Sequence, residues 1–178
     1  MDPTLKEYAL SSLVRIAFPD FKARTYEVQR TLCYPHNYVW TQHQDEPDFL
    51  AANGTIKAVE VFATHENQIK GWALMFVNNK LSDFGEMMDP EGKSSKFRFA
   101  ELAKFCVHPD YRKLGLGSKM MDAMEQHLLK SKSKKAVKWY LLSSDKASAE
   151  YYKRRGWEKC EKSWISSSQF CIRTLAPR

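Results

Sequence analysis

The sequence predicts a mixed α/β fold built around one β-sheet, and two observations carry this prediction. The β-rich runs 56–64 and 68–77 lie on either side of a short polar turn, a pattern typical of a β-hairpin. Further on, the alternating run 97–107 is followed by a helical pattern and then by the compact apolar run 136–142. A strand, a helix and a second strand in this order predict a parallel pair with a right-handed crossover.

The first third of the chain is the least regular part of the sequence. Apolar residues at helical spacing predict an amphipathic helix over 4–17, which Pro19 would end. Residues 21–54 show no consistent period. After the first hairpin, residues 79–95 contain glycine, proline and many polar side chains, which predicts a long surface loop.

The last part of the chain predicts a helix and a second hairpin. Asp145 can cap a helix that runs to Arg155, and Gly156 would end it. The runs 157–165 and 169–175 then predict two antiparallel strands.

Length and composition favour a single domain over 1–178. The chain has 178 residues and is 43% hydrophobic, which suffices for one sizeable core. Its four cysteines lack the paired short spacing of a zinc or redox site, so we expect no metal. The sequence shows no signal-peptide pattern, and no apolar run reaches the ~18 residues of a membrane span. A cytoplasmic protein that does not enter membranes is therefore expected.

The formal net charge of +7 suits an acidic partner, either a phosphorylated ligand or a nucleic acid. The densest group of lysines falls within 130–138, where a solvated helix end explains it better than a recognition patch. The sequence has neither an aromatic RNA-binding strand motif nor a helix-turn-helix with a basic second helix. A nucleic-acid-binding protein is therefore the weaker alternative.

The stretch from Val107 to Ser118 predicts a phosphate site. It joins the strand 97–107 to the following helix through a short turn that contains two glycines and two cations. Such a turn directs free backbone N–H groups and the positive end of a helix toward one point. A dinucleotide fingerprint would need a third glycine where Met120 stands, and the Gly-Lys-Ser/Thr of a P-loop does not occur.

The spacing Arg112-x-x-Gly115-x-Gly117 resembles the Arg/Gln-x-x-Gly-x-Gly/Ala signature of the GNAT acetyltransferases. The preceding run from Val107 to Tyr111 is also similar to that family. The resemblance implies a GNAT-like fold, in which two central parallel strands splay apart to admit the pantetheine arm of acetyl-CoA and helices flank the sheet. It implies that the cofactor is bound by these residues: Phe105, Cys106, Val107, Arg112, Lys113, Leu114, Gly115, Leu116, Gly117, Ser118 and Asp145.

A second block, from Ala149 to Trp157, resembles the Ala-x-x-Tyr-x-x-x-Gly-Phe run of the same family. The resemblance implies that Tyr152 lies near the sulfur of the cofactor and acts as general acid. Asp145 stands where the family often has an asparagine that contacts the cofactor arm. Because an ionised aspartate cannot donate a hydrogen bond, we expect Asp145 to act mainly as a helix cap.

The resemblance covers residues 97–178, which we expect to form the acetyl-CoA-binding core, and the hairpin 56–77 agrees with it in order and length. Residues 1–55 contain no block that resembles the family. We expect them to form a divergent, helical part that binds the acceptor substrate.

Glu101 is the candidate general base. Alternate residues of a strand share a face, so Glu101 is the only charge in an apolar row along 97–107. Burial there disfavours the charged form and makes a carboxylate a better base near neutral pH. The Phe-Ala-Glu run that ends at Glu101 also resembles the histone-type branch of the family, where that glutamate is the base. The alternative is a structural glutamate at a strand edge, paired with Arg98 or Lys104.

The sequence thus predicts an N-acetyltransferase that transfers an acetyl group from acetyl-CoA to a primary amine of a small molecule, a protein lysine or a protein N-terminus. Alternation places Cys106 on the strand face opposite Glu101, which favours direct attack over an acyl-cysteine intermediate. A backbone N–H near Cys106 or Val107 would stabilise the oxyanion. The alternatives are a catalytically silent coenzyme A-binding module of the same fold, which would lack the base and the acid, and a nucleic-acid-binding protein. A homodimer is left open.

Overall fold

The computed structural model describes residues 1–9, 57–77, 97–130, 132–143, 146–159 and 169–176. Four predictions lie outside these residues: the part of the N-terminal helix after residue 9, the loop 79–95, the Asp145 cap and the strand over 160–165.

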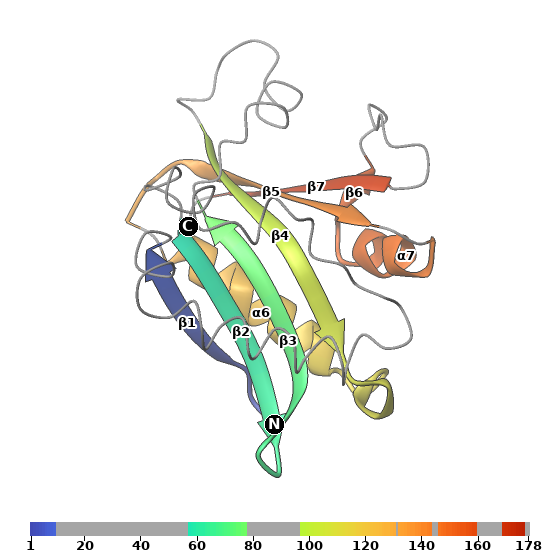
Figure 1. Cartoon of the computed structure of the whole chain (residues 1–178). Coiled ribbons are helices and arrows are strands. Elements are labelled where there is room, and N and C mark those ends of the chain that lie inside the picture. The colour runs from blue at the N-terminus through green and yellow to red at the C-terminus, as the bar shows by residue number, and fades with distance from the viewer. Residues whose placement is uncertain (10–56, 78–96, 131, 144–145, 160–168, 177–178) are drawn as a thin grey trace, which may run out of the picture.

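Within the described residues, seven strands form one sheet in the order β1-β2-β3-β4-β5-β7-β6 (Figure 1). Only β4 and β5 run parallel to each other, and every other neighbouring pair is antiparallel. The strands are β1 (Thr4–Ala9), β2 (Lys57–His65), β3 (Gln68–Val77), β4 (Phe97–Val107), β5 (Ala136–Ser143), β6 (Glu158–Lys159) and β7 (Gln169–Leu175). The 3-10 turn η3 (Pro109–Tyr111) follows β4, and the helices are α6 (Leu116–Leu129) and α7 (Lys146–Arg154). The mixed α/β architecture predicted from the sequence is confirmed.

The helix predicted over 4–17 is wrong for residues 4–9, which form β1 at the edge of the sheet. All six of these residues pair with β2. The sequence of the segment alone does not indicate that a strand edge lies beside it. Tertiary pairing therefore overrides a short apolar pattern that fits either structure. Leu5 packs against the core.

The β2–β3 hairpin is tighter than expected. His65 pairs with Gln68, so Glu66 and Asn67 alone form the turn, with φ angles of 52° and 61°. Positive φ at both central residues is typical of the two-residue turns whose twist matches that of the strands. A register shift in β2 and β3 leaves Lys70 as an extra residue, and such bulges bend and twist a hairpin locally.

Helix α6 covers one face of β2, β3 and β4 (Figure 1). Its methionines and leucines form the stripe that the sequence predicts, and each side chain removed from water contributes about 1.5–3 kcal/mol. The buried residues of the helix are Leu116, Met120, Met121, Met124 and Leu128. No helix in the described part of the chain is long and apolar enough to span a bilayer.

A β-bulge at Ala103 changes the direction of the side chains along β4. Residue 74 of β3 pairs with 104 and residue 75 pairs with 102, so Ala103 is the extra residue. Directly paired residues share a face, and the pairs on the face away from α6 are Trp72–Cys106, Leu74–Lys104 and Phe76–Glu101. Two expectations are therefore wrong. The apolar row of Glu101 does not extend along the whole strand, because Phe105 and Val107 lie on the α6 face and Lys104, a second charge, shares the face of Glu101. Cys106 also lies on the face of Glu101, not opposite it.

Candidate active site

Within the described residues, the pairing between β4 and β5 ends before the final segment of β4. Parallel pairing between β4 and β5 runs from Phe97 and Ala136 to Leu102 and Leu141, and stops at the bulge. Ala103 is the extra residue of the bulge, and residues 104–107 pair only with β3 among the described strands. We call 103–107 the end segment of β4. A strand edge that lies beyond the pairing with its neighbour is the kind of edge along which an extended chain can lie.

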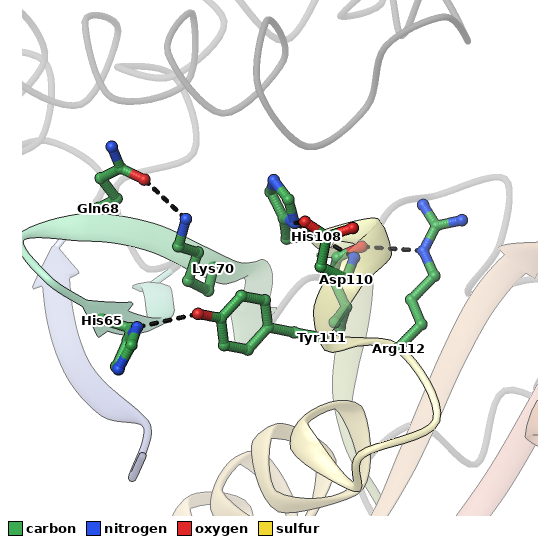
Figure 2. Close-up of polar contacts among 8 residues, drawn as sticks. His65, Gln68, Lys70, His108, Asp110, Tyr111 and Arg112 are labelled. Carbon is green, nitrogen blue, oxygen red and sulfur yellow. Dashed lines mark hydrogen bonds and ion pairs between the residues drawn. The ribbon is translucent and has the colours of Figure 1, made fainter.

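The turn after β4 connects the end segment of this strand to the start of α6. Its backbone is held by hydrogen bonds from Tyr111 N to His108 O (2.9 Å) and from Arg112 N to Pro109 O (3.1 Å). The Arg112 side chain folds back, and its Nε donates to Val107 O over 3.0 Å (Figure 2). The rest of the guanidinium has donors to spare, because Arg carries five N–H groups.

The N-terminus of α6 is suited to an anion. Gly115 is the N-cap and offers no side-chain cap, and the first helical bond of the turn runs from Lys119 N to Gly115 O (3.0 Å). The N–H groups of the intervening residues 116–118 therefore have no partner within the helix. Together with the positive helix end and exposed Arg112 and Lys113, they form an arrangement whose charge and donors suit a phosphate.

The two glycines of the turn have different roles. Gly115 has a φ of 84°, and a methyl group there would meet nothing within 4 Å, so glycine is favoured for its conformation and the space beside it is open. A methyl group at Gly117 would lie 3.5 Å from Phe105 Cζ and from Tyr151 Oη. Gly117 therefore permits α6 to lie close to β4 and α7, which is a packing role.

Glu101 lies on the other face of β4, where it is half-buried. Its Oε2 accepts a hydrogen bond from the Tyr140 hydroxyl over 3.4 Å, and the two residues pair directly across β4 and β5. Burial raises the pKa of Tyr140, and the negative charge of Glu101 raises it further, so the phenol remains a donor at neutral pH.

The alternative of a structural pairing for Glu101 divides in two. Arg98 is on the opposite face, where Nη2 donates to Leu128 O of α6 over 2.7 Å, so Arg98 is not the partner that the alternative requires. Lys104 is buried on the same face as Glu101, because of the bulge. An ion pair within that face therefore remains the competing explanation for the carboxylate.

Tyr152 is buried on the α6 side of the sheet, with only 7% of its surface exposed. Its ring meets the ring of Phe105 edge-on, with centroids 6.4 Å apart, and Phe105 belongs to the end segment of β4. The neighbouring Tyr151 stacks on Phe105 at 6.2 Å, and burial raises the pKa of Tyr151. Glu101 and Tyr152 thus lie on opposite faces of β4, on either side of the point where it separates from β5.

The structure places most of the predicted cofactor residues together: Phe105, Cys106 and Val107 on the end segment of β4, Arg112, Lys113 and Leu114 in the turn, and Gly115, Leu116, Gly117 and Ser118 at the start of α6. Sequence reasoning missed Tyr140 as the partner of Glu101, although the parallel register of β4 and β5 would have identified it. Among the described residues, no group of three His, Cys, Asp or Glu side chains is arranged to hold a metal.

Several solved structures of low sequence identity have this fold. They include mosquito arylalkylamine N-acetyltransferase like 5b, which is 14% identical with a TM-score of 0.58 over 98% of this chain and 100% of that chain. Arabidopsis thaliana NAA60 in complex with acetyl-CoA is 13% identical, with a TM-score of 0.57 over 97% of this chain and 98% of that one. The PaiA N-acetyltransferase of Thermoplasma acidophilum in complex with coenzyme A is 13% identical, with a TM-score of 0.52 over 98% and 100%.

At the level of sequence, the chain has no significant match among curated proteins. The model of the acetyltransferase (GNAT) family, however, matches residues 16–157. The match includes residues 16–55, where the sequence shows no short block that resembles the family. With most of its length matched and the GNAT fold throughout its described part, the chain belongs to the GNAT acetyltransferase family.

Proposed function

We propose that this protein is an N-acetyltransferase that moves an acetyl group from acetyl-CoA directly to a primary amine. The observation that supports this proposal most is the position of the end segment 103–107 of β4, beyond the described pairing with β5. It lies between Glu101 on one face, Tyr152 on the other and the N-terminus of α6 at its end. Backbone groups for an extended arm, N–H groups for a phosphate and candidates for both proton transfers therefore occur in one region.

The residues fit coenzyme A. The space beside Gly115, where a methyl group would meet no described atom within 4 Å, suits the pyrophosphate, as do the N–H groups of residues 116–118, which have no partner within the helix, with Arg112 and Lys113 as cations. The end segment of β4 suits the amide groups of a pantetheine arm. Two structurally similar proteins were solved with acetyl-CoA or coenzyme A, which supports this assignment. When bound, acetyl-CoA supplies the thioester whose acetyl group is transferred.

The proton transfers follow from the two faces of β4. The protonated form of a primary amine has a pKa of about 10, so at neutral pH the amine must lose a proton before it can attack. Glu101 takes this proton, directly or through a water, while Tyr140 holds its other side in place. A backbone N–H near Cys106 or Val107 donates to the negative charge that builds up on the carbonyl oxygen. Tyr152 gives a proton to the departing thiolate.

Direct attack remains the proposed route, although its geometric argument has changed. Cys106 shares the face of Glu101, so position no longer excludes a covalent acetyl-cysteine. Direct transfer needs only the base, the oxyanion donor and the acid named above. Failure to trap an acetylated Cys106 by mass spectrometry, with acetyl-CoA present and no amine, is expected for direct transfer.

The acceptor is proposed only as a primary amine, of a small molecule or of a protein. The test is a panel of amines, peptides and proteins, in which release of free thiol from acetyl-CoA is measured. Amine-dependent release by the parent protein is expected. Binding of coenzyme A without release for any acceptor would favour a catalytically silent binding module of the same fold.

A further inference from the structure

The tip of the β2–β3 hairpin is fastened to the turn that leads into α6. The Tyr111 hydroxyl and His65 Nδ1 are 2.9 Å apart and form a hydrogen bond, and the two rings lie 5.9 Å apart (Figure 2). Lys70 Nζ lies 5.5 Å from the centre of the Tyr111 ring. The backbone takes part as well, since His108 N donates to Lys70 O over 2.8 Å. Tyr111 therefore joins two segments that are far apart in the sequence.

The hairpin is a rigid support for this contact. Its two-residue turn fixes the register at His65, and the bulge at Lys70 gives the tip a local twist. Lys70, the extra residue of the bulge, is the one whose carbonyl and ammonium both meet the turn. The bulge, which changes the direction of side chains along the strand, thus lies where the hairpin contacts the turn after β4.

The turn needs such support because its backbone is strained. Lys113 has a φ of 63°. This backbone conformation costs about 1–3 kcal/mol for a residue other than glycine, and contacts with the surrounding structure must offset that cost. Arg112 braces the turn from inside through its bond to Val107 O. Tyr111 immediately precedes Arg112, and its hydrogen bond to His65 holds the same turn from the side of the hairpin.

We propose that Tyr111 and His65 are positioning residues for the cofactor: their hydrogen bond holds the turn so that the N–H groups at the start of α6 are preorganised for pyrophosphate. This inference rests on the proposed function. Neither side chain needs to touch the ligand, because Tyr111 extends from the turn toward the hairpin (Figure 2). Preorganisation of a loop improves affinity by reducing the cost of ordering it on binding.

The test compares Tyr111→Phe with the parent in coenzyme A titrations and in steady-state kinetics with the best amine. A lost hydrogen bond of this kind should raise the Kd and the KM for the cofactor about threefold to tenfold. The kcat at saturating cofactor should be unchanged. His65→Leu should act alike, and the double variant should be no worse than either single one, since both remove the same bond.

Two controls sharpen the test. Thr174→Val removes a comparable exposed bond, Lys138 Nζ to Thr174 Oγ1 at 3.0 Å, far from the turn, and should leave the Kd unchanged. Lys70→Met removes a charge near the turn but keeps the Tyr111–His65 bond, so a loss of affinity equal to that of Tyr111→Phe would point to charge and overturn the proposal. Unchanged affinity in Tyr111→Phe, or fully additive effects with His65→Leu, would also overturn it. A parent that binds no coenzyme A would instead refute the proposed function itself.

Discussion

The turn after β4 and the face of β4 that carries Glu101 are built in different ways. The turn depends on consecutive residues: Gly115 adopts a φ of 84°, Arg112 bonds back to Val107, and α6 begins at once. The Glu101 face depends on register among three strands, with a bulge at Ala103 that reverses the side-chain pattern. The first region is local, and the second is assembled from distant parts of the chain.

This difference assigns different effects to substitutions in the two regions. Changes in the turn should weaken cofactor binding, because the turn presents backbone groups. Changes on the Glu101 face should lower turnover and leave cofactor affinity nearly intact, because that face offers a proton acceptor. Measuring Kd and kcat for each variant therefore distinguishes effects on the turn from effects on the Glu101 face.

The largest effect is expected for Glu101→Gln. The amide keeps the shape but cannot accept the proton, so kcat near neutral pH should fall by ~10²–10⁴-fold, with the coenzyme A affinity unchanged. Raising the pH should partly rescue the variant, because more of the amine is then neutral. Rates against pH and melting curves of both proteins provide the measurement.

A purely structural Glu101, paired with Lys104, predicts another outcome. The variant would then melt at a lower temperature, and its folded fraction would turn over at a near-normal rate. Parallel pH–rate profiles in parent and variant would contradict the role as base.

Tyr152→Phe should have the next largest effect. Because a thiolate leaves more readily than an amine, it depends less on a general acid. The decrease in kcat should therefore lie at the lower end of the ~10²–10⁴-fold range. The ring remains packed against Phe105 and Trp157, so the melting temperature should change little. The kcat of the variant is measured in stopped-time assays with the best amine. An unchanged kcat would show that another group donates the proton. Tyr151→Phe then tests the neighbouring hydroxyl.

The smallest effect is expected for Tyr140→Phe. Burial and the Glu101 charge raise the pKa of Tyr140, so the parent phenol donates throughout the working range. Without this donor the carboxylate binds its proton more tightly, so the acidic limb of the pH–rate profile should move to higher pH. A bond of about 0.5–1.5 kcal/mol corresponds to a shift of about 0.4–1.1 pH units. A shift to lower pH would contradict the hydrogen bond as the cause.

Much of the sheet could be predicted from sequence. Alternation located β2, β3 and β4, and the crossover helix between β4 and β5 fixed their parallel pairing. The strand β1 could not be predicted, because its partner edge lies on β2, some fifty residues away in the chain. The single-domain prediction over 1–178, and the role of the N-terminal part in acceptor binding, remain predictions.

The candidate site shows the same division. Gly115, Gly117 and Arg112 form a local motif, so spacing alone could locate them. The partner of Glu101 could not be found without the register that pairs it with Tyr140. The bulge at Ala103 escaped as well, since an alternating sequence does not reveal an extra residue, and it moved Cys106 to the other face.

The central claim is that the turn after β4 and the start of α6 hold coenzyme A, and calorimetric titration of Gly117→Val with acetyl-CoA tests it most directly. The valine would press on Phe105 and Tyr151 and displace the first turn of α6, so binding should be lost while the parent binds at one site. Gly117→Ala is the matched control: its methyl group would sit at an ordinary contact distance of 3.5 Å, and most of the affinity should remain. Unchanged affinity in a folded Gly117→Val, or no binding by the parent, would contradict the account.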